Sequence, residues 1–164
     1  MAVDTYTLSF AEIFAKVSKI KSKKEKVSFL KQYQTDALRM VVKSSFDPKI
    51  VWALPEGEVP YTPNDAPEGT EHSNLSYEAR KLYHYIQGGN PGLSQSKRES
   101  MFVGLLESLH PDEADILVAS KDKLLHQKYK GLSKNVVMEA FDWDDDYIRI
   151  EQADYPQSKG LAGG

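Results

Sequence analysis

Apolar residues recur at every third or fourth position in several stretches of this chain, which is the spacing of an amphipathic helix. The first stretch, residues 9–17, begins with Ser9 and has Glu12 three positions later, as in a capping box. Its apolar positions are Phe10, Ile13, Phe14 and Val17. We therefore predict a helix that begins after Ser9 and buries this face.

Two more helices are predicted before residue 47. One begins at Ser22, with Glu25 in the matching capping position. The other covers residues 36–42 and ends before Asp47, which precedes a proline. The positions expected to be buried are Val27, either Phe29 or Leu30, and Tyr33 in the first of these helices, and Leu38, Val41 and Val42 in the second.

Residues 47–75 have a different character. Five of the eight prolines lie there, and few apolar positions are periodic. The composition predicts a long extended or turn-rich connection. Two apolar pieces, residues 50–54 and 59–61, are expected to pin it to the core. A connection of this length is often functional or marks a boundary between lobes.

Helical spacing returns after Ser76 and continues to residue 141. Helices are expected from Ser76 to the glycines at 88–89, over Met101 to Leu106, from Pro111 to Val118, around residues 122–126, and over residues 135–141 behind a Ser133 cap. Because sustained strand alternation is absent, the predicted fold is all-α.

The predicted organisation is a compact multi-helix domain, residues 1–141, followed by an acidic C-terminal tail, residues 142–164. Its two halves, residues 9–46 and 76–141, each contain an amphipathic helix, a turn rich in Ser, Lys and Arg, and an apolar helix. The two halves are either true pseudo-repeats, or they are similar only because helical bundles in general have this pattern. The Pro-rich connection, 47–75, joins them.

The net charge of −3 conceals a strong charge pattern. Residues 1–46 carry a balance of +5, residues 47–75 carry −5, residues 76–141 carry +1, and the tail carries −4. Six lysines fall within residues 16–26, interleaved with serines. Such segregation creates a local field even when the total charge is small, and a polyanion is the natural partner of the basic segment.

The sequence lacks the residues that several kinds of catalytic or metal site require. There is no cysteine, and no nucleotide-binding or nucleophile motif occurs. An alignment of Asp142 with a calcium loop places Tyr147 where glycine is required. The four histidines show no metal-ligand spacing: His72, His84, His110 and His126. We therefore expect a protein that is not an enzyme and binds no cofactor or metal.

The N-terminus shows no signal peptide, and no apolar run is long enough to cross a membrane. These features predict a cytoplasmic protein without a membrane partner. The sequence does not indicate an oligomeric state.

A family resemblance adds to this interpretation. The segment from Phe10 to Leu30, with its Ser22-Lys23-Lys24-Glu25-Lys26 turn, and the segment from Gln127 to Phe141, with Gly131 and Ser133, resemble the N-terminal helical DNA-binding domain of ATP-dependent DNA ligases, especially those of phages. The nucleotidyltransferase signature, Lys-x-Asp-Gly, is absent from the chain. The chain also looks like a small uncharacterised protein of tailed phages, which would place it in the host cytoplasm.

The resemblance implies that helix N-termini and loop side chains bind the DNA backbone. Carried over by position, the candidate nucleic-acid-binding residues are Ser22, Lys23, Lys24, Lys26, Ser96, Lys97, Arg98, Lys130, Gly131, Ser133 and Lys134. Lysines and exposed amides suit phosphate oxygens, and glycine allows close backbone approach. The expected function is non-catalytic, phosphate-directed binding of nucleic acid, either DNA or RNA, with duplex DNA favoured.

Two alternatives involve the acidic tail or the Pro-rich connection. In the first alternative, the protein is an adaptor that docks on replication or transcription machinery through the tail or the region of Trp52 and Tyr61. In the second, the tail mimics the charge of DNA and competes with it for the basic segment.

Overall fold

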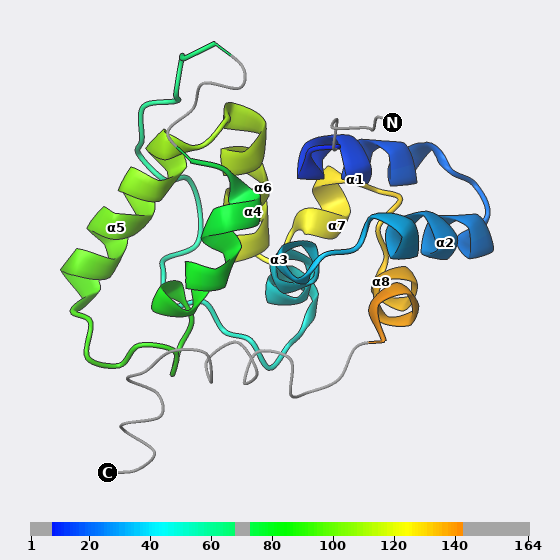
Figure 1. Cartoon of the computed structure of the whole chain (residues 1–164). Helices are drawn as coiled ribbons and strands as arrows, with labels where there is room; N and C mark the ends of the chain where they lie inside the picture. Colours follow the sequence, from blue (N-terminus) through cyan, green and yellow to red (C-terminus); the bar gives the residue numbers. More distant parts are fainter. Residues whose placement is uncertain (1–7, 68–72, 143–164) are drawn as a thin grey trace.

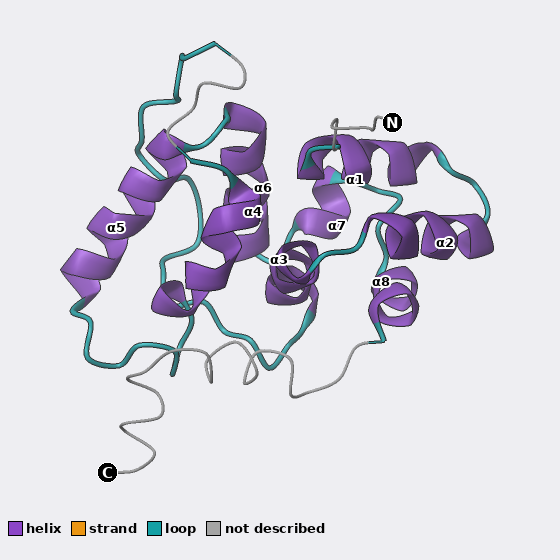
Figure 2. Ribbon diagram, in the orientation of Figure 1, coloured by secondary structure: helices purple, strands orange, loops and turns teal. Residues whose placement is uncertain are grey.

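A computed structural model describes residues 8–67 and 73–142 (Figure 1). Its regular elements are α1 (Phe10–Lys19), α2 (Lys23–Tyr33), α3 (Asp36–Phe46), α4 (Leu75–Glu78), the 3₁₀ helix η1 (Ala79–Tyr85), α5 (Gln95–Ser108), α6 (Pro111–Lys121), α7 (Leu125–Lys128) and α8 (Lys134–Phe141). The described residues contain no β-strand, and the predicted all-α fold is confirmed (Figure 2).

Side-chain caps fix where most of these helices begin. Ser9 and Glu12 form the predicted capping box at α1: the Glu12 amide donates to Ser9 Oγ at 3.1 Å, and the Ser9 amide donates to Glu12 Oε1 at 2.8 Å. Ser22 and Ser133 cap α2 and α8 as predicted. The helix predicted at residues 122–126 instead begins at Leu125, after Lys123 takes a left-handed conformation with φ 62°.

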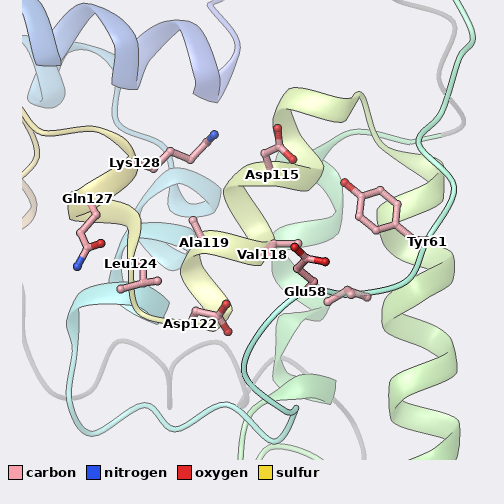
Figure 3. Close-up of a pocket in the computed structure, with 10 residues that line it drawn as sticks. Glu58, Tyr61, Asp115, Val118, Ala119, Asp122, Leu124, Gln127 and Lys128 are labelled. Atoms are coloured by element: carbon pink, nitrogen blue, oxygen red, sulfur yellow. The ribbon is translucent and has the colours of Figure 1, made fainter.

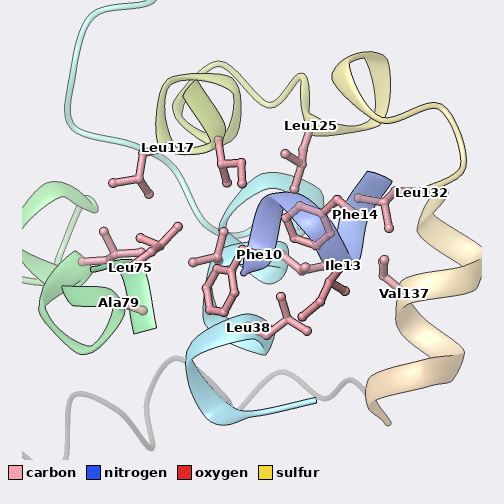
Figure 4. Close-up of a cluster of buried hydrophobic side chains, with 14 of the residues drawn as sticks. Phe10, Ile13, Phe14, Leu38, Leu75, Ala79, Leu117, Leu125, Leu132 and Val137 are labelled. Atoms are coloured by element: carbon pink, nitrogen blue, oxygen red, sulfur yellow. The ribbon is translucent and has the colours of Figure 1, made fainter. Parts of the chain in front are cut away.

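The hydrophobic core draws on helices from the whole chain. Phe14, Val17, Leu30, Leu38, Val41 and Val42 are fully buried from the first three helices, so Leu30 rather than Phe29 fills the core position of α2. Figure 4 shows Leu117, Leu125, Leu132 and Val137, from later elements, around the same cluster. Helix α3 lies at the centre and contacts α4, η1, α6, α7 and α8.

The Pro-rich connection is held across the surface by buried anchors. Ile50 and Trp52 enter the core, and Trp52 Nε1 donates to the Ser44 carbonyl at 2.9 Å. The buried Lys121 ammonium donates to the carbonyls of Pro55 at 2.7 Å and Gly57 at 3.1 Å. Residues 50–54 therefore anchor the connection as predicted, and two of their side chains are buried in the core and do not merely contact its surface.

The helix predicted after Ser76 differs from the structure. Only one α turn forms before the chain tightens into η1. The Ala53 amide donates to the Tyr85 carbonyl at 2.7 Å, and the Gln87 amide donates to the Val51 carbonyl at 2.8 Å. This long-range pairing, which includes the isolated bridge between Trp52 and Ile86, holds residue 86 in an extended conformation and so ends the helical run.

The helices do not pack as two separate halves in chain order. Helix α8 packs mainly on α2, and α6 packs on α3 and α5 and also contacts α1. In Figure 1, α1, α2 and α8 lie on the right and α5 lies on the left, with α3 between them. The last described helix therefore joins the first two, which brings the basic segments of both halves into one unit.

Candidate nucleic-acid interface

The turn between α1 and α2 carries the first group of predicted residues. Ser22 Oγ accepts from the Glu25 amide at 3.3 Å, so its hydroxyl is committed to the helix cap. Lys23 and Lys24 are exposed, and Lys26 is partly exposed. Lys23 Nζ lies 3.3 Å from Glu139 of α8, and both side chains are more than half exposed. This ion pair ties the start of α2 to the end of α8.

Gly131 has a structural role that the sequence did not reveal. A Cβ at this position would lie 2.3 Å from Ser18 Cα and 2.8 Å from the Val17 carbonyl oxygen. The Gly131 amide also faces Ser18 Oγ at 3.4 Å. Glycine is therefore required because the loop packs backbone to backbone against the end of α1. The buried Gly131 is corrected from a ligand-binding residue to a packing residue.

This backbone contact brings two basic segments together. Lys19 follows Ser18 and Lys130 precedes Gly131, and both lysines are exposed. Tyr129 anchors the same loop, with its ring centroid 5.3 Å from that of Phe14. Burial, and then Asp112 and Asp115, raises the pKa of Tyr129 to about 12, so this phenol stays neutral at ordinary pH.

A concave pocket adjoins this loop. It measures about 510 Å³ and is lined by Ser45, Phe46, Lys123, His126, Lys130, Leu132, Ser133 and Lys134. Three predicted residues, Lys130, Ser133 and Lys134, therefore meet at one site at the start of α8. We refer to it as the basic pocket. Ser133 Oγ accepts from the Val136 amide at 3.3 Å and caps the helix.

Lys123 and His126 also line the basic pocket, and neither was among the predicted binding residues. Lys123 Nζ donates to the Asp47 carbonyl at 2.7 Å. Burial lowers the pKa of Lys123, and the nearby Asp47 carboxylate opposes that change. The exposed His126 ring lies 6.2 Å from the Phe46 ring, between centroids. Lys123 follows Lys121 and Asp122, and His126 lies among Leu125, Gln127 and Lys128, so neither belongs to a basic run that would mark a site.

The third predicted group lies elsewhere. Ser96 and Lys97 are exposed in the first turn of α5, which Figure 1 shows on the side of the molecule opposite α2 and α8. Arg98 is only 8% exposed. Its guanidinium donates to the carbonyls of His84 at 2.8 Å, Asn90 at 3.0 Å and Leu93 at 3.2 Å. The prediction for Arg98 is corrected: its donors hold the fold, and it presents no cation to a ligand.

Charge is segregated in space as well as in sequence. We define the basic lobe as residues 8–35 and 129–142, which carry nine lysines and four carboxylates. The acidic lobe, residues 47–67 and 73–122, carries six basic and eleven acidic side chains. Within the described chain, Lys23 has the one lysine–carboxylate ion pair of the basic lobe. The two lobes therefore present opposite fields to a charged partner.

A groove on the acidic lobe bears on the adaptor alternative. It measures about 710 Å³ and lies between the Pro-rich connection and helices α6 and α7. Figure 3 shows Glu58, Tyr61 and Asp115 around it, with Leu124 on the side of α7. Trp52, which the sequence suggested as a docking residue, is buried, so the adaptor interpretation loses this residue. The predictions for the acidic tail beyond Asp142 fall outside the described residues.

The described residues also bear on metal binding and on membrane insertion. In residues 8–67 and 73–142, no group of three or more His, Asp or Glu side chains is placed to hold a metal ion. None of the helices described there combines the length and apolar character needed to cross a bilayer.

The chain matches a known protein family. The model of a family of unknown function, DUF6433, matches residues 13–127, which is more than half of the chain. The matched region contains the α1–α2 turn, Lys123 and His126, and it ends before Lys130. Neither the curated proteins nor the solved structures give a match. The resemblance to DNA ligases therefore stays a prediction.

Proposed function

We propose that this chain, which belongs to the DUF6433 family of unknown function, is a non-catalytic nucleic-acid-binding protein. It holds the phosphate backbone of duplex DNA with its basic lobe. The resemblance to phage ligases suggests an accessory role in phage DNA metabolism. The observation that carries the proposal is the contact between Ser18 and Gly131, which joins the lysines of the α1–α2 turn to those around the start of α8.

Two physical arguments support this function. Duplex DNA carries a layer of condensed cations, and lysines that lack carboxylate partners can neutralise its phosphates and release those cations with a gain in entropy. Helices α2 and α8 also begin in the basic lobe, and the amides of a first helical turn favour anionic oxygens. Binding of this kind is insensitive to base sequence and positions the protein along the strand.

The test is a salt titration of DNA binding measured by fluorescence anisotropy. Replacement of Lys23, Lys24 and Lys26 together by alanine should weaken binding to all duplex sequences alike. Log affinity falls as log salt rises, and each lost phosphate contact should make this negative slope shallower by about 0.9. Full affinity in this triple variant, or wild-type affinity that is independent of salt, would contradict the proposal.

The adaptor function remains the second candidate because the groove on the acidic lobe has an apolar wall and acidic edges. Glu58 and Asp115 are exposed there, and Leu124 is 40% exposed. A partner segment with basic and apolar side chains would complement it. Pull-down from lysate with and without nuclease distinguishes the two functions. Partners that survive nuclease favour the adaptor, and partners that nuclease removes are bridged by nucleic acid.

A further inference from the structure

The basic pocket has two chemically different sides. We call Lys130, Lys134 and the start of α8 its cationic side, and the rings of Phe46 and His126 its aromatic side. Its volume of about 510 Å³ lies within the range of small-molecule sites. A flat lysine patch would suit a phosphate backbone alone, whereas this hollow offers aromatic surface beside the cations.

The cationic side has unused hydrogen-bond donors. The first four amides of an α-helix lack helical partners. At α8 the Val136 amide donates to Ser133 Oγ, and the Val137 amide donates to the Ser133 carbonyl at 3.0 Å. This leaves the amides of Lys134 and Asn135 for an external acceptor. Lys130 and Lys134 are exposed and form no ion pair with a carboxylate in the described chain.

The aromatic side is open to solvent. His126 is exposed, and Phe46 is partly buried against the core, with the two ring planes inclined at 59°. The buried Leu132 also lines the pocket. A nucleobase packs well on such a surface because every base has an aromatic face. A base in a duplex cannot reach it, since its faces are covered by neighbouring base pairs.

We propose that the basic pocket binds one unpaired nucleotide of a nucleic acid strand. Its phosphate is held by Lys130, Lys134 and the first turn of α8, and its base packs against His126 and Phe46. This inference rests on the proposed function and adds to it a preference for strands with an exposed base, such as a single-stranded stretch or a frayed end. Lys123 supplies a third ammonium group, which already donates one hydrogen bond to the Asp47 carbonyl.

The test compares three labelled 12-mers by fluorescence anisotropy at one salt concentration: single-stranded oligodeoxythymidine, an abasic strand of the same length, and a blunt duplex. The full-length protein is compared with His126→Ala and with His126→Phe, which retains an aromatic ring. His126→Ala should weaken binding of the thymidine strand about five-fold or more, while His126→Phe preserves it. Both variants should bind the abasic strand and the duplex within two-fold of wild type.

The abasic strand is the decisive control. It keeps every phosphate, so a variant that merely loses positive charge or folds poorly weakens its binding as well. Unchanged thymidine binding in His126→Ala, or an equal loss for both single strands, would overturn the pocket assignment. In either case, salt-dependent duplex binding by the wild type would leave the proposed function standing. Failure of the wild type to bind any of the three probes would refute both.

Discussion

Replacement of Arg98 by methionine separates a structural role from a ligand-binding role. The guanidinium bonds three main-chain carbonyls and Gln95 Oε1, at distances of 2.7–3.2 Å. A hydrogen bond to a charged group contributes about 1.5–3 kcal/mol. Asn90 and Leu93 are half-buried, so in the variant water would replace part of the hydrogen bonding that their carbonyls lose. Methionine keeps the apolar stem, and the expected loss in the free energy of unfolding is about 3–5 kcal/mol.

The assay is urea denaturation, with the midpoint of thermal unfolding as a second readout. The loss corresponds to a fall of about 6–20 °C in the midpoint of thermal unfolding for a chain of this size. Lys97→Met is the matched control, because Lys97 is the preceding residue and is exposed. It should change stability by less than about 0.5 kcal/mol. A loss below about 1 kcal/mol in Arg98→Met would refute the structural role, as would selective loss of DNA binding by a stable variant.

Three further changes test other contacts. Gly131→Ala places a Cβ 2.3 Å from Ser18 Cα, whereas two carbon atoms in contact need about 3.5 Å. We expect the free energy of unfolding, measured by urea denaturation, to fall by about 1–3 kcal/mol. Unchanged stability would contradict the close approach. Trp52→Phe loses the buried bond to the Ser44 carbonyl and should cost at least about 1 kcal/mol, and an equally stable variant would show that this bond is dispensable. Burial lowers the pKa of His84, so the unfolded chain takes up its proton first and stability falls as pH drops below about 6.5. His84→Gln should flatten this fall in urea midpoints between pH 7 and 5, and an identical pH profile would count against it.

Local signals in the sequence were enough to place most helices. The Ser9 and Ser133 caps and the apolar spacing of α1 act within a few residues, so the sequence displays them directly. The 3₁₀ helix η1 could not be foreseen in this way. Its end is set by hydrogen bonds to Val51 and Ala53, more than thirty residues earlier in the chain.

The candidate interface was harder to predict for the same reason. Two segments have similar sequences, Ser96-Lys97-Arg98 and Ser22-Lys23-Lys24. In the structure Arg98 is buried among main-chain carbonyls, whereas Lys23 and Lys24 are exposed. Guanidinium offers five fixed donors and suits such a cage, but only the fold shows whether carbonyls surround it. The basic pocket likewise exists only because the end of α3, Lys123 between α6 and α7, and His126 of α7 meet the start of α8.

The most direct test of the account is a pair of double variants in a salt series with duplex DNA. Lys19 and Lys130 flank the contact between Ser18 and Gly131, whereas Lys81 and Lys97 lie on the acidic lobe. Changing the first pair to alanine should weaken binding and make the negative slope of log affinity against log salt shallower by up to about 1.8, while changing the second pair leaves both unchanged. Equal affinities and equal slopes for the two double variants would contradict the claim that the basic lobe binds the phosphate backbone.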